Sequence, residues 1–255
     1  MSYYKLGLLL LSLFFSFSSN AQDKIIRVAL ASSLMPAMEE IKRAFESEND
    51  VQLDLIPGAS GTLTNQILHG APYDIFISAN EKYGQLLDEQ GFLAGAPIIL
   101  VNGALVIWSS RQMTSISNSN HAMLAEYLDS PKVKTIAIAQ PGLAPYGDAA
   151  KTYLIKIGVF DQIQSKLIYG NNLTITNQYI YTKSADVVLT SLSSQIKMKS
   201  IAPKYWYSPE FETHLAHSIC LLKNSRVELL KLQCFMFQPK SISIFEKYGY
   251  SLIIQ

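Results

Sequence analysis

The chain has 255 residues, of which 49% are hydrophobic, and carries 21 Lys and Arg against 20 Asp and Glu. A net charge of +1 without a dense basic run argues against nucleic acid or an anionic membrane surface as the main partner. Lys5, an apolar stretch at 8–17 and a small-x-small end at Ala21 predict a signal peptide over residues 1–21, cleaved after Ala21. The predicted product is exported and has 20 basic and 20 acidic residues.

Strand and helix patterns alternate along the rest of the chain, which predicts an α/β fold with mainly parallel sheets. The first series has strands at 25–31, 51–56, 73–78, 98–101 and 104–108, and helices at 34–45, 62–69 and 80–90. The second has strands at 133–139, 167–169 and 187–190, helices near 121–128, 147–157 and 173–181, and an extended segment at 202–208. A strand at 215–222 and helices near 225–237 and 241–248 end the chain.

The two series predict two lobes joined by two hinge crossings. Lobe 1 is assigned residues 22–103 and 216–255, and lobe 2 residues 104–215. In such folds, ligands bind beyond the carboxyl ends of the strands, in the crevice between the lobes.

Two strands of the first series run directly into serines at a helix start. Ser32 and Ser33 follow the first strand, and Ser60 follows the second. The first turn of a helix has free N–H groups and the positive end of the helix dipole, so it attracts anions. Because neither turn contains Lys or Arg, the pattern predicts an oxyanion held by neutral donors.

The second series offers two further helix starts. Tyr146 lies in an Ala-Pro-Tyr-Gly turn after the strand at 133–139, and Leu173 follows Gly-Asn-Asn after the strand at 167–169. Tyr146 has both an N–H and a phenolic O–H to donate, and Leu173 has a free N–H. Four helix starts, two from each lobe, are thus expected to converge on one tetrahedral anion.

These motifs resemble those of the periplasmic molybdate-binding proteins of ABC transporters, which have the type II periplasmic binding fold. The resemblance rests on Ala-Ser-Ser-Leu at 31–34, Gly-Ala-Ser-Gly-Thr-Leu at 58–63, Gly-Ala-Pro-Tyr-Asp-Ile-Phe-Ile-Ser-Ala at 70–79, Ala-Pro-Tyr-Gly at 144–147 and Ile-Phe-Glu-Lys-Tyr-Gly-Tyr at 244–250. It spans essentially the whole predicted mature chain, with the motifs in order.

The resemblance implies particular site residues. Ser33 and Ser60 would bind oxyanion oxygens through hydroxyl and backbone N–H, with Ser32 sharing the first role. Tyr146 and Leu173 match positions that donate in the family. Ser191 stands where many members place a ligand Tyr, which is a departure that Tyr146 is expected to compensate.

The resemblance also implies a function. The chain would be a periplasmic solute-binding protein, without enzymatic activity or a cofactor, that captures molybdate or tungstate and delivers it to an inner-membrane ABC permease. It would act as a monomer, and molybdenum would be held only as the oxyanion, through the same residues. A site made only of donors suits a fully deprotonated dianion and leaves the proton of hydrogen phosphate without an acceptor.

Alternatives remain open at this point. The ligand could be sulfate or another oxyanion. The chain could also be a periplasmic sensor that passes the signal of its bound anion to a membrane partner rather than to a permease. A secreted serine hydrolase using Ser60 is disfavoured because Thr62 replaces the second glycine of a Gly-x-Ser-x-Gly elbow. His214 and His217 lack further ligands at zinc spacing. Cys220 and Cys234 could form a disulfide or remain thiols.

Overall fold

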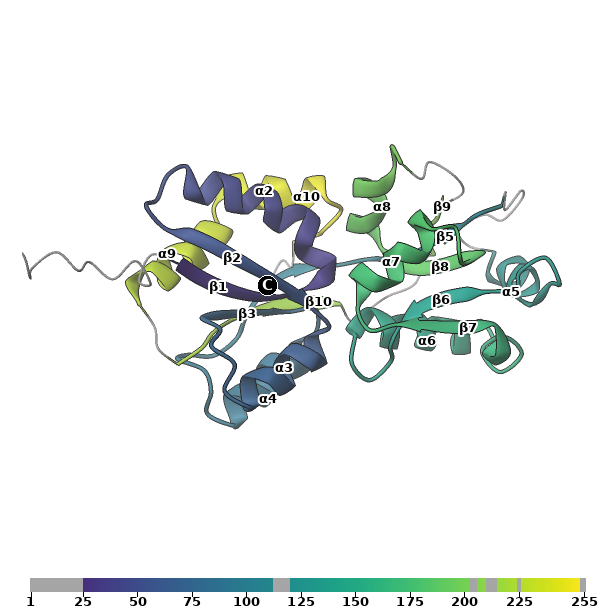
Figure 1. Ribbon diagram of the computed structural model, residues 1–255, viewed down its shortest axis with the longest axis horizontal. Helices are drawn as coiled ribbons and strands as arrows, with labels where there is room; N and C mark the ends of the chain where they lie inside the picture. Colours follow the sequence, from purple (N-terminus) through teal and green to yellow (C-terminus); the bar gives the residue numbers. More distant parts are fainter. Residues whose placement is uncertain (1–24, 112–119, 202–205, 210–214, 224–225, 253–255) are drawn as a thin grey trace, which may run out of the picture.

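The computed structural model describes residues 25–111, 120–201, 206–209, 215–223 and 226–252 (Figure 1). The predicted signal peptide and His214 lie outside these residues, as does most of the segment predicted to be extended at 202–208. Among the described helices, none has the length and apolar character needed to cross a membrane.

The first lobe is a five-stranded sheet with the order β2-β1-β3-β10-β4. Its strands are β1 (Ile25–Ala31), β2 (Gln52–Gly58), β3 (Ile75–Ser78), β4 (Ile98–Asn102) and β10 (Ala216–Leu221). Its helices are α2 (Met35–Glu46), α3 (Ser60–Leu68), α4 (Glu81–Glu89), α9 (Val227–Met236) and α10 (Pro239–Lys247), and the short 3-10 turn η2 (Ser32–Leu34) precedes α2. β1 is parallel to β2 and β3, whereas β10 is antiparallel to β3 and β4.

The second lobe is another five-stranded sheet, with the order β7-β6-β8-β5-β9. Its strands are β5 (Leu105–Ser109), β6 (Ile136–Ala139), β7 (Leu167–Gly170), β8 (Val187–Ser191) and β9 (Trp206–Tyr207). Its helices are α5 (His121–Asp129), α6 (Pro145–Lys156), α7 (Leu173–Tyr181) and α8 (Leu192–Met198), with the 3-10 turn η3 (Gln164–Lys166). β6 is parallel to β7 and β8, and β5 is antiparallel to β8 and β9.

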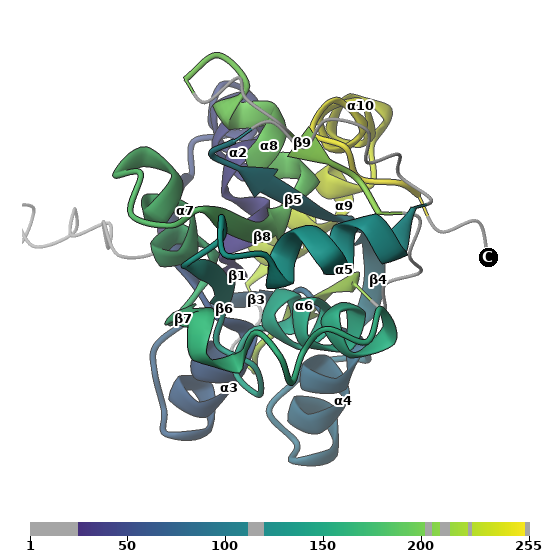
Figure 2. The same cartoon turned by 90° about the vertical axis from the view of Figure 1, so that its right-hand side faces the viewer.

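Helices cover both faces of each sheet, which explains why β3, β6 and β8 are buried along their whole length. In the first lobe, α2, α9 and α10 pack on one face, and α3 and α4 pack on the other (Figures 1 and 2). In the second lobe, α5 and α6 pack on one face, and α7 and α8 on the other. These layers confirm the predicted two-lobed α/β fold.

The chain crosses between the sheets twice. It leaves the first sheet after Asn102 and enters the second at Leu105, then returns between Tyr207 and Ala216. The predicted lobe boundaries, at 103/104 and 215/216, lie in these two connections. Ala216 begins β10, the strand with which the chain returns to the first lobe. His217 therefore lies next to the second crossing.

Two helices of the site begin earlier than expected from the sequence. α3 begins at Ser60 instead of Thr62, and α6 begins at Pro145 instead of Gly147. Proline suits the first helical position because its missing N–H would have had no partner there. Ser60 and Tyr146 therefore lie in the first turns of their helices.

The two cysteines are free thiols. Cys220 is buried in β10, and Cys234 is exposed on α9. The sequence left open whether the two cysteines form a disulfide or remain thiols, and the structure shows two separate thiols.

Candidate ligand-binding site

A small cavity lies where the helix starts of the two lobes meet. The residues that line it are Ala31, Ser32, Ser33, Gly58, Ala59, Ser60, Ala79, Ala144, Pro145, Tyr146 and Leu173. The volume that the centre of a water molecule can occupy in this cavity is about 10 Å³. With the lobes closed, the cavity therefore has space for about one water-sized group. The cavity brings together five of the six predicted ligand residues, and none of the lining residues carries a formal charge.

Ser60 offers the clearest donor in this cavity. Its side chain is fully buried at the start of α3, and its Oγ accepts the N–H of Ala79 at 3.0 Å. Among the described hydrogen bonds, none uses the proton of the Ser60 hydroxyl. Since Ala79 occupies a lone pair, the Ser60 O–H remains available to donate to a ligand.

Ser32 has a different role from Ser60. Its Oγ donates to the carbonyl of Gly58 at 3.1 Å, which ties η2 to the end of β2. The Ser32 hydroxyl lines the cavity, but its proton is already donated to Gly58 and is not available to a ligand.

Tyr146 and Leu173 come from the second lobe. Both are 3% exposed, and both lie in the first turn of a helix, where backbone N–H groups have no intrahelical acceptor. A Cβ on Gly147 would lie 2.3 Å from the carbonyl oxygen of Ala139, so only glycine allows α6 to start this close to β6. The side chain of Asp148 accepts the N–H of Gly142 at 2.7 Å and holds the preceding turn.

Ser191 is the predicted residue that the structure does not bring to the cavity. Its Oγ accepts the N–H of Ser194 at 3.2 Å and caps α8. It also lies 2.7 Å from the Ser194 hydroxyl and 3.0 Å from the Ser193 hydroxyl. The Ser191 side chain is therefore engaged within the second lobe.

Ser33 is paired with His217, a residue to which the sequence motifs assign no role in the anion site. The Oγ of Ser33 lies 3.0 Å from Nε2 of His217, which is fully buried in β10. Nδ1 of His217 lies 2.8 Å from the carbonyl oxygen of Leu215. Burial lowers the pKa of His217 from 6.5 to about 4, and backbone hydrogen bonds with Leu215 and Val101 act in the opposite direction. The ring is therefore neutral at pH 7.

Two further hydroxyls fix the backbone of Ser33. Tyr250 donates its phenolic O–H to the Ser33 carbonyl at 2.7 Å, and Ser193 donates to the same oxygen at 2.6 Å. The ring of Tyr250 also stands edge-on to that of His217, with centroids 5.3 Å apart. These residues lie far from Ser33 in the sequence. Tyr250 ends the motif at 244–250, but that motif does not indicate a contact with Ser33.

Tyr146 completes the polar cluster. Burial raises the pKa of Tyr146 well above its ordinary value, and a hydrogen bond with the side chain of Ser33 acts in the opposite direction. A Cβ on Gly103 would lie 2.2 Å from the Tyr146 Oη, so the glycine at the first crossing makes room for the phenol.

Direct contacts join the lobes on both sides of the cavity. Lys197 on α8 lies 2.8 Å from a carboxylate oxygen of Glu39 on α2, and Lys82 on α4 lies 3.1 Å from Asp148 on α6. The N–H of Gly61 donates to a carbonyl of the second lobe, that of residue 143, at 2.8 Å. The structure therefore represents the closed arrangement of the lobes.

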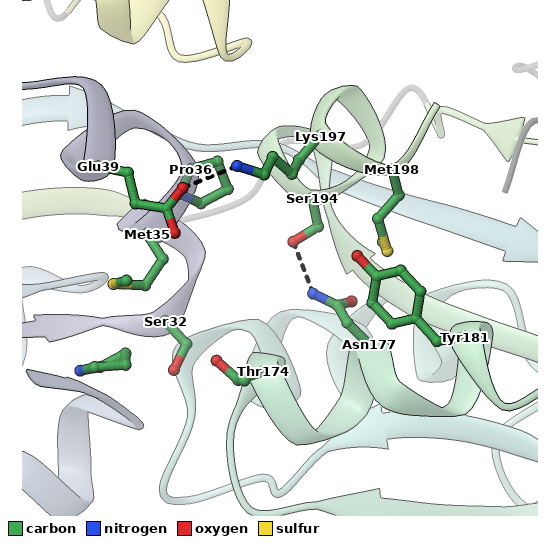
Figure 3. A pocket seen from close by; sticks show the side chains of 11 residues that line it. Ser32, Met35, Pro36, Glu39, Thr174, Asn177, Tyr181, Ser194, Lys197 and Met198 are labelled. Atoms are coloured by element: carbon green, nitrogen blue, oxygen red, sulfur yellow. Dashed lines mark hydrogen bonds and ion pairs between the residues drawn. The ribbon is translucent and has the colours of Figure 1, made fainter. Parts of the chain in front are cut away.

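A larger pocket of about 260 Å³ lies at the rim of the cleft (Figure 3). It shares Ser32 with the small cavity and is bordered by the Lys197–Glu39 ion pair. The amide of Asn177 donates to the Ser194 hydroxyl at 2.9 Å and accepts from Thr190, so it is already satisfied within the second lobe. This pocket therefore adjoins the small cavity at Ser32.

The alternatives of a hydrolase and a metal site gain nothing from this geometry. Within the described residues, no histidine is hydrogen-bonded to Ser60, the nucleophile of the hydrolase alternative. The same residues contain no cluster of three or more His, Cys, Asp or Glu that could hold a metal ion.

Two lobes closed over a small cavity of neutral donors define a solute-binding protein. The chain belongs to the family of bacterial extracellular solute-binding proteins, whose sequence profile matches residues 26–251. It is 27% identical over 237 residues to the molybdate-binding protein ModA of Azotobacter vinelandii, covering 91% of this chain and 92% of that protein. ModA of Rhodobacter capsulatus is also 27% identical, with 90% and 89% covered. The solved periplasmic molybdate-binding protein of Azotobacter vinelandii superposes with a TM-score of 0.81 at 25% identity, covering 90% of this chain and all of that one.

Proposed function

We propose that this chain is a periplasmic receptor for molybdate, with tungstate as a close analogue, that delivers the anion to an inner-membrane ABC permease. The observation that carries the proposal is the cavity, which two lobes line with neutral donors from four helix starts. The relatives that bear the name of molybdate-binding protein cover about nine-tenths of the chain. The proposed mature protein begins after Ala21 and acts as a monomer.

The proposed ligands are Ser33, Ser60, Tyr146 and Leu173, with Ser32 supporting the first turn. A dehydrated dianion needs many donors, and hydrogen bonds to a charged acceptor are stronger than neutral ones. Helix ends add a favourable field without a flexible cation. Closing the lobes removes water and strengthens each of these interactions. Molybdenum is then bound only through its oxygens, and no separate cofactor is needed.

We propose that the chain binds its ligand without carrying out a chemical reaction. Among the described residues, His217 is hydrogen-bonded to a cavity serine, and its low pKa makes it a weak proton acceptor at neutral pH. Closure instead produces a shape that a membrane partner can recognise, which is the mechanism of a capture protein.

Thermal unfolding with molybdate, tungstate, sulfate and phosphate added separately tests the proposal. A ligand at 100 times its dissociation constant stabilises the folded state by about 2.7 kcal/mol. We expect a clear rise in Tm with molybdate and tungstate, and a smaller rise or none with sulfate and phosphate. A response to sulfate alone would keep the receptor and change the ligand, whereas no response to any anion would refute the proposal.

A further inference from the structure

The hydrogen bonds around Ser33 have a defined direction. A carbonyl oxygen only accepts, so the short contact between Leu215 and Nδ1 of His217 places the proton of the neutral ring on Nδ1. Nε2 is then an acceptor, and Ser33 donates its proton to it. The Ser33 hydroxyl proton is thus directed away from the cavity.

This direction conflicts with a fully deprotonated oxyanion. Such a ligand has only acceptor oxygens, and the lone pairs of Ser33 would face them across the cavity. An unfavourable contact of this kind costs affinity because neither oxygen supplies a hydrogen. A second proton on His217 removes the conflict. With Nε2–H donating to Ser33, the Ser33 O–H can donate to the ligand.

We propose that His217 is a positioning residue of the anion site that takes up one proton when a dianionic oxyanion binds, and so converts Ser33 into a donor to the ligand. This inference rests on the proposed function. The proton comes from solvent, and no covalent bond to the ligand forms or breaks.

The distances make this coupling strong. Nε2 lies 3.0 Å from the Ser33 Oγ, and one hydrogen bond of roughly 2.7 Å would join that Oγ to the ligand. The imidazolium would thus lie within about 6 Å of the nearest ligand oxygen, a separation at which an opposite charge favours the protonated form. Without a bound anion, burial opposes the same charge and keeps the pKa of His217 at about 4.

The other groups that face His217 do not titrate near neutral pH. They are the phenols of Tyr146 and Tyr250, which approach from α6 and from the segment after α10. Burial raises the pKa of both phenols above the ordinary value of tyrosine. From β4 the backbone of Val101 hydrogen-bonds to the ring, and no charged side chain of the described residues acts on it. The pairing of β10 with β4 is irregular between His217 and Ser218, as is common beside functional sites.

Isothermal titration calorimetry with molybdate tests the inference. Titrations at pH 7 in buffers of different ionisation enthalpy count the protons taken up, and we expect close to one per molybdate bound. We also expect the Kd for molybdate to rise by about tenfold per pH unit between pH 6.5 and 8, which is the slope for one linked proton. The rise should stop above the pKa of His217 in the molybdate complex.

His217→Gln removes the titrating ring and should abolish both the proton uptake and the pH slope. His121→Gln is the matched control, because His121 also contacts a hydroxyl, that of Tyr153 at 3.0 Å, but lies on α5 and does not line the cavity. It should retain both. Molybdate binding by the unaltered protein without proton uptake would overturn the inference, as would uptake that persists in His217→Gln.

A second measurement does not depend on the variant folding. In the unaltered protein labelled with 15N-histidine, one of the four histidines should change from the Nδ1–H neutral form to the imidazolium when molybdate is added at pH 7. Molybdate binding with all four ring signals unchanged would overturn the proton coupling alone. The absence of any binding heat at any pH would overturn the proposed function, and the coupling with it.

Discussion

Ser60→Ala tests the geometry of the anion site most directly. The Ser60 hydroxyl is buried, accepts from Ala79 and keeps its own proton for the ligand. A hydrogen bond to a charged group contributes about 1.5–3 kcal/mol, so the substitution should raise the Kd for molybdate by roughly 10- to 150-fold. Calorimetric titration measures this change.

The same substitution has a separate cost in the free protein. It leaves the N–H of Ala79 without the Ser60 oxygen, and Ala79 is only 1% exposed. An unsatisfied buried N–H costs about 1–3 kcal/mol of the free energy of unfolding. Urea unfolding without ligand measures this loss, which affects the free and the bound state alike and therefore does not enter the Kd.

Ser32→Ala is the matched control for Ser60→Ala. The Ser32 hydroxyl lines the same cavity, but its proton is given to Gly58. We expect its removal to change the Kd for molybdate by less than about threefold, below the effect of losing a hydrogen bond to a charged group. An unchanged Kd in Ser60→Ala, or equal losses in the two variants, would refute the assignment of Ser60 as the free donor.

Three further predictions concern the cluster behind the cavity. Tyr146→Phe should weaken molybdate binding by about 1.5–3 kcal/mol, measured by calorimetry, whereas an unchanged Kd would leave only the backbone N–H as donor. Gly103→Ala would place a Cβ 2.2 Å from the Tyr146 Oη and 2.9 Å from Cε1 of His217. It should lower the free energy of unfolding by about 1–3 kcal/mol and reduce the thermal stabilisation by molybdate; full retention of both would contradict the close packing. The third prediction is an acid effect: because the pKa of His217 is about 4 in the folded protein and 6.5 in the unfolded chain, the unfolded chain binds more protons between these values. The free energy of unfolding of the ligand-free protein should therefore fall by up to about 3 kcal/mol from pH 6.5 to pH 4, and urea unfolding of His217→Gln should lack this part of the dependence.

Local sequence patterns predicted most of the fold. Most strands are short apolar runs, and helices such as α2 have amphipathic spacing, so most elements and their alternation follow from neighbouring residues. The helix α8 was not predicted. The strand-to-helix turns with Ser33, Ser60, Tyr146 and Leu173 were predicted in the same way, and the structure places all four around one cavity. The boundaries of α3 and α6 were less accurate, because the first turn of a helix has no intrahelical bonds that would define it.

The sequence by itself determined the secondary structure, the two lobes and the helix starts that supply neutral donors. Only the tertiary structure decided where the protons of these donors go. Ser33 meets His217 across 184 positions and Tyr250 across 217 positions, and Ser191 turns inward to cap α8. The direction of a hydrogen bond depends on which partner lies opposite, and partners brought together by the sheet order leave no periodic or local signal in the chain.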